Sequence, residues 1–379
     1  MYQEVADCLL KIFELGCVQR ITQQVCAKRS AAHPERTINS ANRQDRSLHR
    51  GYCNGSRPRR LTALLAGGVL ATLFAAAGAE EFAQPFEFAP LQAQNRTGRV
   101  TVLGALKLSN HTPDGAALHE LSDLAWDADE RLLYAVSDAG FLVALSPQIE
   151  GQHLSGVAVR WRAPLRDATG QALSGDDADA EGMVLFNGEN QRAGDSLLAV
   201  SFEHHPRVFY FTPHGAYRGA VRLPPRLRDL SHYQTPNQAL EALAWSPTLG
   251  FVTGPERPLR GIAADVIQLF AEDGREWQFP AAAPSSALVG LAARSPSEFI
   301  VLERRYISRW QPLVISLRKV SLMPPAKREE IARFDSSQGW AVDNFEGIAH
   351  HIENRYFIVS DDNANPQQKT LLVYLALSL

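Results

Sequence analysis

The stretch from Asn344 to Leu377 reads NFEGIAHHIENRYFIVSDDNANPQQKTLLVYLAL. It contains three short runs of mainly apolar and β-branched residues, and the segment DDNANPQQK between the last two is rich in turn-forming residues. Such a pattern predicts three consecutive antiparallel strands. Carboxylates stand at the ends of these runs, at Glu346, Asp361 and Asp362. Because like charges repel, acids gathered at strand ends need either solvent or a cation nearby.

The first run of this stretch recurs along the chain. Its versions are LSDLAW from Leu121, AEGMVL from Ala180, LEALAW from Leu240, LVGLAA from Leu288 and FEGIAH from Phe345, at intervals of 48 to 60 residues. A second apolar run follows each version, and a third run and a turn often come next. Short strands repeating at this spacing are typical of β-propeller blades. A β-sandwich, the alternative all-β fold, does not predict the same pattern five times.

The sequence therefore predicts an all-β propeller with five blades, closed by strands from both ends of the domain. The last repeat supplies three strands, and we expect its outer strand to come from RVTVLGALKL at Arg99–Leu108. This pairing would close the ring by joining the two ends of the domain and would remove an exposed strand edge. Six blades would require a degenerate blade around residues 222–238, and the sequence leaves this alternative open.

Residues 57–79 have the composition of a secretory signal peptide. A basic start at 57–60 precedes an apolar run at 61–77, and small residues lead to a cleavage point near Ala79. The alternative is a single membrane anchor over residues 61–79, because roughly 17–19 apolar residues are close to the minimum for a span. The expected location is periplasmic or extracellular, and contact with a membrane is expected only if this segment is retained.

The remaining chain divides into three further parts. Residues 1–56 are expected to be a non-native or disordered leader, residues 80–98 a linker, and residues 99–379 the propeller domain. All four cysteines, Cys8, Cys17, Cys26 and Cys53, lie in the first part, so the exported domain needs no disulfide. Residues 80–379 hold 38 − 11 = 27 Lys and Arg against 41 − 5 = 36 Asp and Glu. Their net charge of 27 − 36 = −9 makes nucleic acid an unlikely partner.

Two repeat positions carry most of the acids. The residue after the first apolar position of each repeat is Ser122, Glu181, Glu241, Val289 or Glu346. The expected end of the second strand is Asp138, Glu203, Glu256, Glu303 or Asp361. In a propeller the first strands line a central channel, so these side chains are expected to gather at one mouth of it. Some of the acids could instead cap loops or pair with arginine, as Glu303 could with Arg304 or Arg305.

Clustered carboxylates of this kind suit a calcium ion, which takes six to eight oxygen ligands in flexible geometry. The metal ligands expected here are Glu181, Glu241, Glu346 and Asp361, and another divalent metal is the alternative. The residues expected to face substrate in the channel are Asp138, Glu203, Glu256, Asp362 and Asn363. The sequence has no G-x-S-x-G serine motif, P-loop or dinucleotide fingerprint.

Taken together, the repeats resemble the bacterial "esterase-like activity of phytase" family over residues 99–379. The similarity is carried by LSDLAWDADERLLYAVSD, DAEGMVLFNGENQRAGDSLLAVSFEHHPRVFYF, NQALEALAWSP, IVLERRY and the stretch quoted first. The resemblance implies an exported β-propeller that hydrolyses phosphate or carboxylate esters. It places the family's E-G acids on Glu181, Glu241 and Glu346, its L-E-R pair on Glu303 and Arg304, and its S-D-D-N group on Asp361, Asp362 and Asn363. The chain departs from this pattern at Ser122, Val289 and Ala242.

Two functions are consistent with these features. The first is a metal-dependent hydrolase of small-molecule esters, in which Arg304 and Glu303 act at the reacting group. The second is a non-enzymatic propeller of the cell envelope that binds a ligand or a protein and holds structural calcium. Metal-dependent turnover of a phosphate or acyl ester separates the two hypotheses.

The signal-peptide interpretation makes a direct prediction. N-terminal sequencing of protein recovered from the exported fraction should give a chain that begins near Glu80, because the small residues before it suit cleavage. Recovery of a longer chain in the membrane fraction would support the anchor instead.

Overall fold

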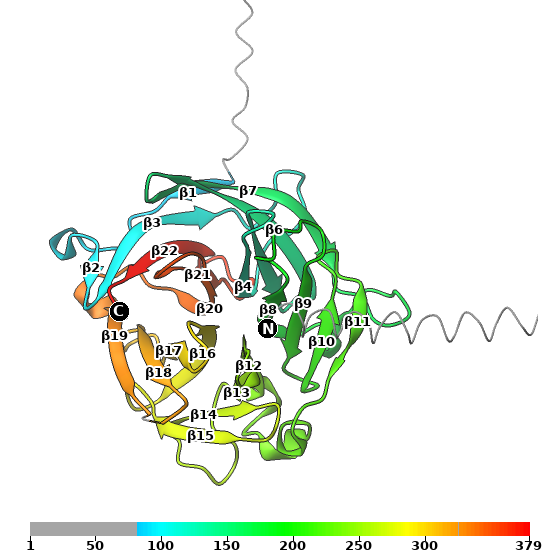
Figure 1. The fold of residues 1–379 in the computed structure, drawn as a ribbon. Coiled ribbons are helices and arrows are strands. Elements are labelled where there is room, and N and C mark those ends of the chain that lie inside the picture. The colour runs from blue at the N-terminus through cyan, green and yellow to red at the C-terminus, as the bar shows by residue number, and fades with distance from the viewer. Residues whose placement is uncertain (1–81, 325) are drawn as a thin grey trace, which may run out of the picture. The chain divides into compact units, whose positions relative to one another are not determined.

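The computed structural model describes residues 82–324 and 326–379. Their strands form five antiparallel sheets arranged as blades around a central axis, as Figure 1 shows. The predicted five-bladed propeller is therefore confirmed. The predicted leader at 1–56 and signal peptide at 57–79 lie outside the described residues.

Each blade runs outward from the axis in chain order. Blade 1 has β4 (Leu121–Asp127), β5 (Leu132–Ser137), β6 (Phe141–Glu150) and β7 (His153–Pro164). Blade 2 has β8 (Ala180–Phe186), β9 (Leu197–Phe202), β10 (Arg207–Phe211) and β11 (Tyr217–Val221). Blade 3 has β12 (Leu240–Ser246), β13 (Gly250–Pro255), β14 (Val266–Ala271) and β15 (Glu276–Pro280). Blade 4 has β16 (Ser286–Ala293), β17 (Glu298–Arg305), β18 (Val314–Ser321) and β19 (Arg328–Asp335).

Blade 5 is built from both ends of the described chain. Its order from the axis is β20 (Asn344–His350), β21 (Arg355–Asp361), β22 (Leu371–Leu377), β3 (Val100–Leu108) and β1 (Ala83–Pro85). A short strand, β2 (Arg96–Thr97), also pairs with β3. The register joins Val373 of β22 to Ala105 of β3, so the predicted closure by Arg99–Leu108 is confirmed.

The hydrophobic cores lie between the blades. Among the described residues, five apolar clusters each span two neighbouring blades. The middle strands are buried on both faces; for example, every residue of β5 is buried. They consequently read as continuous apolar runs rather than as alternating patterns. Outer strands such as β11 alternate between partly buried and exposed residues.

Residues 82–98, the described part of the segment predicted as a linker, are part of the propeller. Residues Ala83–Pro85 pair with β3, and Phe88 is buried against Phe334, Trp340 and Phe345 between blades 4 and 5. The prediction was wrong because this stretch is too short and too rich in Pro and Gln to show a strand pattern by itself. Its order comes from apolar side chains that find a place against distant strands.

The alternative of a sixth blade is also excluded. Residues in the 222–238 region form three short 3-10 turns, η3 (Pro225–Leu227), η4 (Leu230–His232) and η5 (Pro236–Gln238), rather than strands. The other such turns are η1 (Leu91–Ala93), η2 (Gly175–Asp177) and η6 (Ser336–Gln338). In the described part of the chain, no helix has the length and apolar character needed to cross a membrane.

The closure of blade 5 makes a stability prediction. Leu375 lies between Tyr356 of β21 and Val102 of β3 and is fully buried. Leu375→Ala should lower the free energy of unfolding by about 3 kcal/mol, because it leaves a cavity where the two chain ends meet. Urea unfolding measures this loss. The control Leu91→Ala, at a residue that is 88% exposed, should change the free energy little; equal losses would show that the closure contributes no special stability.

Candidate functional site

Every inner strand carries a β-bulge near its first residue. In each blade the pairing register shifts there, so that at least one residue has no partner on the second strand. The bulged residues are Ser122, Glu181, Glu241, Val289 and Glu346, and Gly182 shares the bulge of blade 2. A bulge bends its strand and re-aims a side chain. The repeat position that the sequence marks with Glu is therefore the bulge itself.

The close approach of neighbouring inner strands explains why glycine follows glutamate in the E-G pattern. A Cβ on Gly182 would lie 2.6 Å from the backbone nitrogen of Leu243, in the next blade. A Cβ on Gly290 would lie 2.5 Å from the carbonyl oxygen of Glu346. Side chains do not tolerate such distances, so glycine is needed where neighbouring inner strands converge. Blade 3 has Ala242 instead, which is buried in the cluster between blades 3 and 4.

In blade 1 the residue after the bulge is Asp123, which the repeat pattern did not mark as a site residue. Its carboxylate accepts hydrogen bonds from the backbone N–H of Met183 in blade 2, at 2.7 Å, and of Ile348 in blade 5, at 3.0 Å. Burial raises the pKa of Asp123 to about 8, although these bonds act in the opposite direction. Asp123 therefore ties three inner strands together. The sequence carries one signal for Asp123: it is an acid at a repeat position where the other four repeats have Gly or Ala.

A second position faces the axis from the end of the second strand. The residues before the bulge pair as Leu121–Ser137, Ala180–Phe202, Leu240–Pro255, Leu288–Glu303 and Phe345–Ser360. The next residues of the second strands are Asp138, Glu203, Glu256, Arg304 and Asp361. We use the name axial site for three sets of residues. These are the five residues just named, the five bulged residues, and the five residues that lie two positions before a bulge. The residues two before the bulges are Glu120, Asp179, Ala239, Ala287 and Asn344.

The register corrects the expected place of Glu303. The comparison of repeats grouped Glu303 with Asp138 as an acid at the end of the second strand. In the structure Glu303 pairs with Leu288, and Arg304 is the residue of blade 4 that corresponds to Asp138. Neighbouring residues of a strand point to opposite faces, so a shift of one residue moves a side chain away from the axis. Glu303 is fully buried and accepts hydrogen bonds from Arg318 Nη1, at 2.8 Å, and from the Ala282 N–H, at 2.6 Å. Burial raises its pKa, and these two partners oppose the rise.

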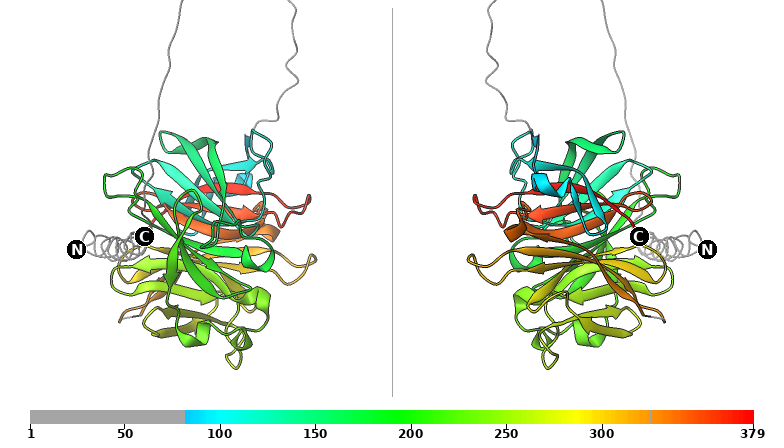
Figure 2. Two further views of the ribbon diagram at one scale, coloured as in Figure 1. Left: turned by 90° about the vertical axis from the view of Figure 1, so that its right-hand side faces the viewer. Right: turned by 90° about the vertical axis from the view of Figure 1, so that its left-hand side faces the viewer.

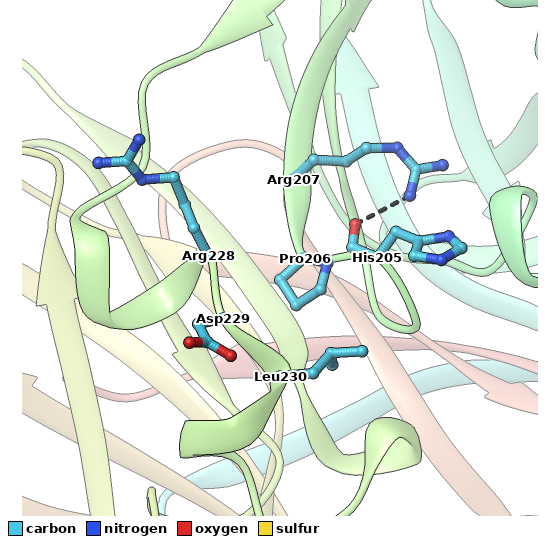
Figure 3. Close-up of a pocket in the computed structure, with 6 residues that line it drawn as sticks. All are labelled: His205, Pro206, Arg207, Arg228, Asp229 and Leu230. Carbon is cyan, nitrogen blue, oxygen red and sulfur yellow. Dashed lines mark hydrogen bonds between the residues drawn. The ribbon is translucent and has the colours of Figure 1, made fainter.

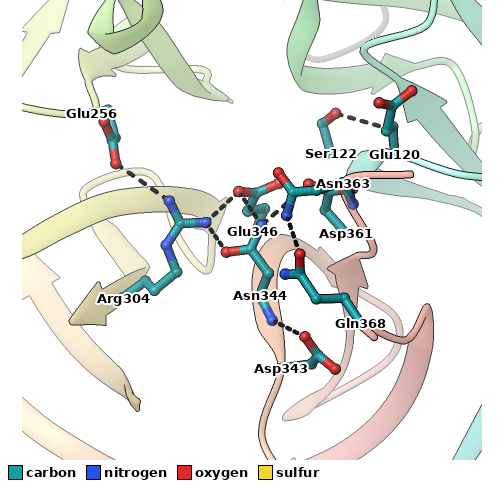
Figure 4. Close-up of polar contacts among 10 residues, drawn as sticks. All are labelled: Glu120, Ser122, Glu256, Arg304, Asp343, Asn344, Glu346, Asp361, Asn363 and Gln368. Atoms are coloured by element: carbon teal, nitrogen blue, oxygen red, sulfur yellow. Dashed lines mark hydrogen bonds and ion pairs between the residues drawn. The ribbon is translucent and has the colours of Figure 1, made fainter. Parts of the chain in front are cut away.

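Arg304 is the centre of a polar network in the axial site (Figure 4). Its Nη1 donates to the Glu346 carboxylate and to the side-chain oxygen of Asn344, and its Nη2 lies 3.3 Å from Glu256 Oε1. Burial opposes the charge on Arg304, but Glu346, Glu256 and Glu241 outweigh burial and raise the pKa of the guanidinium. Arg304 is therefore a permanent cation facing the acids.

Glu346 and Asp361 lie together, as the sequence predicts. The Asn344 amide nitrogen donates to Glu346 Oε1 at 2.9 Å and to Asp361 Oδ2 at 3.1 Å. Asp361 is only 4% exposed, and burial, with Glu346 as the next cause, raises its pKa to about 8. Asn344 thus bridges two carboxylates that would otherwise repel one another.

Asp362 and Asn363 have other surroundings. Asp362 Oδ1 accepts the backbone N–H groups of Glu120, at 3.0 Å, and Ala364, at 3.2 Å. Asn363 donates its backbone N–H to Asp361 Oδ1 and its side-chain amide to Gln368. These bonds shape the turn after β21. Asp362 also lines a cavity of about 300 Å³ beside the turn, together with Lys107, His119 and Lys369.

The acids of blades 1 and 2 form the other side of the axial site. One ligand atom each of Asp179, Glu203 and His204 lies within 4.8 Å of the others, and His204 Nδ1 is hydrogen-bonded to Asp179. His205, the next residue, contacts Asp177 instead. The repeat pattern does not mark Glu120 and Asp179, because only blades 1 and 2 carry an acid two residues before the bulge.

A separate cavity of about 380 Å³ lies outside the axial site, at the edge of blade 2 (Figure 3). It is lined by His205, Pro206, Arg207, Arg228, Asp229 and Leu230. Arg207 stacks over Phe202, at 4.1 Å from the ring centroid, and donates to the His205 carbonyl. The His205 ring bonds to Asp177 and the Asp229 carboxylate accepts the Ser231 N–H, so these side chains do not converge on one point in the cavity.

Three axial carboxylates have no partner in the described part of the chain. Asp138, Glu181 and Glu241 accept no hydrogen bond there, although Glu241 is only 7% exposed. Burial, followed by repulsion from Glu120 and Asp361, raises the pKa of Asp138 to about 9. Burial and neighbouring acids raise the pKa values of Glu181 and Glu241 well above the usual range. Such a donor set fits a hard divalent cation, which replaces protons as the neutralising charge.

A family model described as phytase-like, "Esterase-like activity of phytase", matches residues 116–364. The chain belongs to this family. The match spans all the bulged residues of this phytase-like propeller. It also spans the axial residues at the ends of the second strands, from Asp138 to Asp361. It confirms the resemblance that the repeats indicated.

Comparisons with other proteins add structural similarity at low identity. No curated protein matches the phytase-like chain. Raptor of Chaetomium thermophilum is similar with 10% identity and a TM-score of 0.34, over 77% of this chain and 30% of that one. Selenomethionine-substituted virginiamycin B lyase of Staphylococcus aureus is similar with 11% identity and a TM-score of 0.34, over 78% of this chain and 99% of that one. This chain therefore spans only 30% of the length of Raptor.

The raised pKa values make a prediction about pH. Asp138 and Glu203 have pKa values of about 9 in the folded protein, and Asp361 about 8. In the unfolded chain these groups titrate near 4. The folded state thus binds more protons between about pH 4 and 9, and its stability should fall as pH rises through this range.

Melting temperatures in the presence of a chelator, measured from acid to alkaline pH, test this expectation. Asp138→Asn should make the melting temperature less dependent on pH, because it removes one of the titrating groups. A metal-free protein whose melting temperature stays constant or rises toward pH 9 would contradict the electrostatic account of the axial site.

Proposed function

We propose that this phytase-like propeller is a divalent-cation-dependent hydrolase of small phosphate or carboxylate esters, with Ca²⁺ as the cation. The observation that carries the proposal is a set of buried and half-buried carboxylates, Asp138, Glu181 and Glu241, which accept no hydrogen bond in the described part of the chain. Carboxylates in this state store unfavourable free energy unless a cation binds. Folds alone do not define function, so the proposal depends on this site.

Glu181, Glu241, Glu346 and Asp361 would hold the cation. They supply only oxygen ligands, which suit Ca²⁺ better than a soft transition metal. Asp138 stands next to this set and could provide a further oxygen. The histidine at 204 is bonded to Asp179 and lies at the edge of the acids, so a metal that accepts imidazole is the alternative.

The chain's own groups would then act on the ester. A bound calcium ion supplies positive charge next to the ester oxygens. Arg304 can hold an anionic oxygen of the substrate with its remaining N–H groups and stabilise charge that develops there. Glu203, whose pKa burial and Asp179 raise to about 9 in the metal-free protein, would be the group that donates a proton to the leaving group. Glu303 has no role in this scheme, because both of its oxygens are engaged away from the axis.

One observation favours the rival function, a binding propeller with structural calcium. Arg304 already contacts Glu346, Asn344 and Glu256. If these bonds persist in the presence of calcium, Arg304 serves to neutralise acids rather than to bind a substrate. Turnover therefore decides between the two functions, and calcium binding alone does not.

We also propose that the protein works outside the cytoplasm. The proposal is supported by the signal-like composition of residues 57–79 and by the absence of cysteine from residues 80–379. Extracellular calcium modules function with millimolar to submillimolar affinity, so a site of oxygen ligands suits that location.

Glu241→Gln tests the cation site. The substitution keeps the shape of the side chain but removes one unpartnered charge, so calcium affinity should fall about tenfold. The calcium-dependent rise in melting temperature should shrink accordingly. Glu150→Gln, at an exposed residue at the end of β6, is the matched control.

Hydrolysis of p-nitrophenyl phosphate and p-nitrophenyl acetate should be measured on the same proteins. The hydrolase proposal expects turnover that a chelator abolishes and that Glu241→Gln and Arg304→Ala both reduce. A wild-type protein that calcium does not stabilise contradicts the cation site. Calcium stabilisation without turnover of either ester favours the binding propeller.

A further inference from the structure

The loop that joins β17 to β18 has an apolar tip. Tyr306, Ile307 and Trp310 are 55%, 44% and 81% exposed. Among the described residues, the only other large hydrophobic side chains with comparable exposure are Leu91, Met323 and Ile352, each in a different segment. Exposed apolar residues scattered singly need no explanation, but three on one short loop indicate a binding surface.

The loop stands at the same end of the propeller as the axial site. β17 ends at Arg305, directly after Arg304, and the loop begins with the next residue. Figure 2 shows the β17–β18 loop and the β21–β22 loop extending from one face of the ring. Whatever binds the tip is therefore brought toward the mouth at which the axial acids lie.

The tip is flanked by arginines without acidic partners. Arg305 Nε donates to the Pro284 carbonyl at 3.2 Å, and Arg257 Nη1 donates to the next carbonyl, that of Ser285, at 2.9 Å. These two guanidinium groups therefore lie close to one another. Arg309 lies over the Trp310 ring, with its Cζ atom 4.5 Å from the centroid. None of the three makes an ion pair with a carboxylate in the described part of the chain.

The loop is held in shape by its own hydrogen bonds. The Gln311 N–H donates to the Ser308 carbonyl at 3.0 Å and closes a turn at the tip. At the base, the Leu313 N–H donates to Ser336 Oγ and the Ser336 N–H donates to the Leu313 carbonyl, each at 3.0 Å. Presenting a pre-shaped apolar tip costs less conformational entropy on binding than ordering a loose one.

We propose that the loop Tyr306–Trp310, with Arg257, Arg305 and Arg309, docks the propeller onto an anionic lipid surface. Trp and Tyr prefer the interface between headgroups and acyl chains, where an amphipathic ring has both an apolar and a polar neighbour. Arginines around such a tip attract anionic headgroups, at about 1 kcal/mol for each charge near the surface. A narrow, convex tip is also too small to bury the area that a stable protein interface needs.

The local charge is what makes this attraction specific. Residues 80–379 carry a net charge of −9, so the domain as a whole is repelled by an anionic surface. The three arginines of the tip make no ion pair among the described residues, so they can attract such a surface locally although the axial acids lie at the same end of the ring. Docking by this loop turns the axial site toward the lipid, which would place lipid-borne esters within its reach; this last step rests on the proposed hydrolase function.

Sedimentation of residues 80–379 with vesicles tests the docking itself. This part contains every strand of the closed ring and all five cores, and it lacks the apolar segment at 61–79, which could bind lipid independently. The experiment is done in chelator, so that calcium cannot bridge the acids to the headgroups. The protein should bind vesicles of phosphatidylcholine mixed with phosphatidylglycerol, and bind those of phosphatidylcholine alone weakly or not at all. Added salt should weaken the binding.

Variants identify the surface. Ile307→Ala with Trp310→Ala should weaken vesicle binding by about tenfold or more, because both side chains lose apolar area that is buried on docking. Arg309→Ala should weaken it about fivefold, the equivalent of one charge near the surface. Ile352→Ala is the matched control, because Ile352 is 49% exposed on the β20–β21 hairpin at the other end of the blades. All variants replace exposed side chains, and their melting temperatures should match that of the wild type.

Three results would overturn the proposal. In the first, the wild-type protein does not sediment with the mixed vesicles. In the second, the double variant binds the vesicles as well as the wild type does. In the third, Ile352→Ala loses as much vesicle binding as the double variant. Self-association that depends on Trp310, without vesicle binding, would assign the tip to a second copy of the chain instead. Because no result depends on turnover, the docking proposal and the hydrolase proposal fail separately.

Discussion

The convergence of five inner strands at one axis determines most of what this propeller can do. The strands approach so closely that Gly182, Gly290 and Gly347 have no room for a Cβ atom. Directly before this narrow point each strand bulges, and the bulge releases one side chain from the packing between blades. The repeats therefore place Glu and Gly next to each other for two reasons. Glu occupies the bulge and contributes to the axial site, and Gly allows the inner strands to approach closely.

The closed ring also allows the acids to stay where they repel one another. Five cores between the blades and the β22–β3 pairing hold the inner strands in place. Folding free energy from these cores offsets the cost of burying carboxylates such as Asp361 and Glu241. The protein reduces the cost locally with Arg304 and Asn344 on one side of the axis. On the other side the carboxylates keep protons or await a cation.

The blades are alike in fold but differ in charge. Blades 1, 2 and 3 contribute acids to the axial site, whereas blade 4 contributes Val289, Ala287 and Arg304. Blade 4 also carries the apolar loop with its unpaired arginines. Blade 5 adds Glu346 and Asp361, so the axial mouth is acidic except at Arg304, which contacts Glu256 and Glu346 of the two neighbouring blades. This difference follows from a few substitutions in one repeat, while the strand pattern is unchanged.

The sequence by itself determined the architecture and most of the candidate ligands. The repeated six-residue pattern was sufficient for the five blades, and the apolar run at Arg99–Leu108 was sufficient for the closure, because strand patterns and repeat spacing are local properties of the chain. Glu181, Glu241, Glu346 and Asp361 were found in the same way. The packed strand β1, which the sequence assigned to a linker, was missed because its order comes from distant partners.

Only the tertiary structure decided which neighbours share a site. Strand pairing puts Arg304 rather than Glu303 at the axis, and spacing cannot reveal this because the lengths of the second strands and of the turns before them differ between blades. Asp123, Glu120 and Asp179 were likewise visible only once the inner strands were placed side by side. The linear chain contains the acids, but their mutual distances, burial and raised pKa values arise from bringing residues of five blades to a single axis.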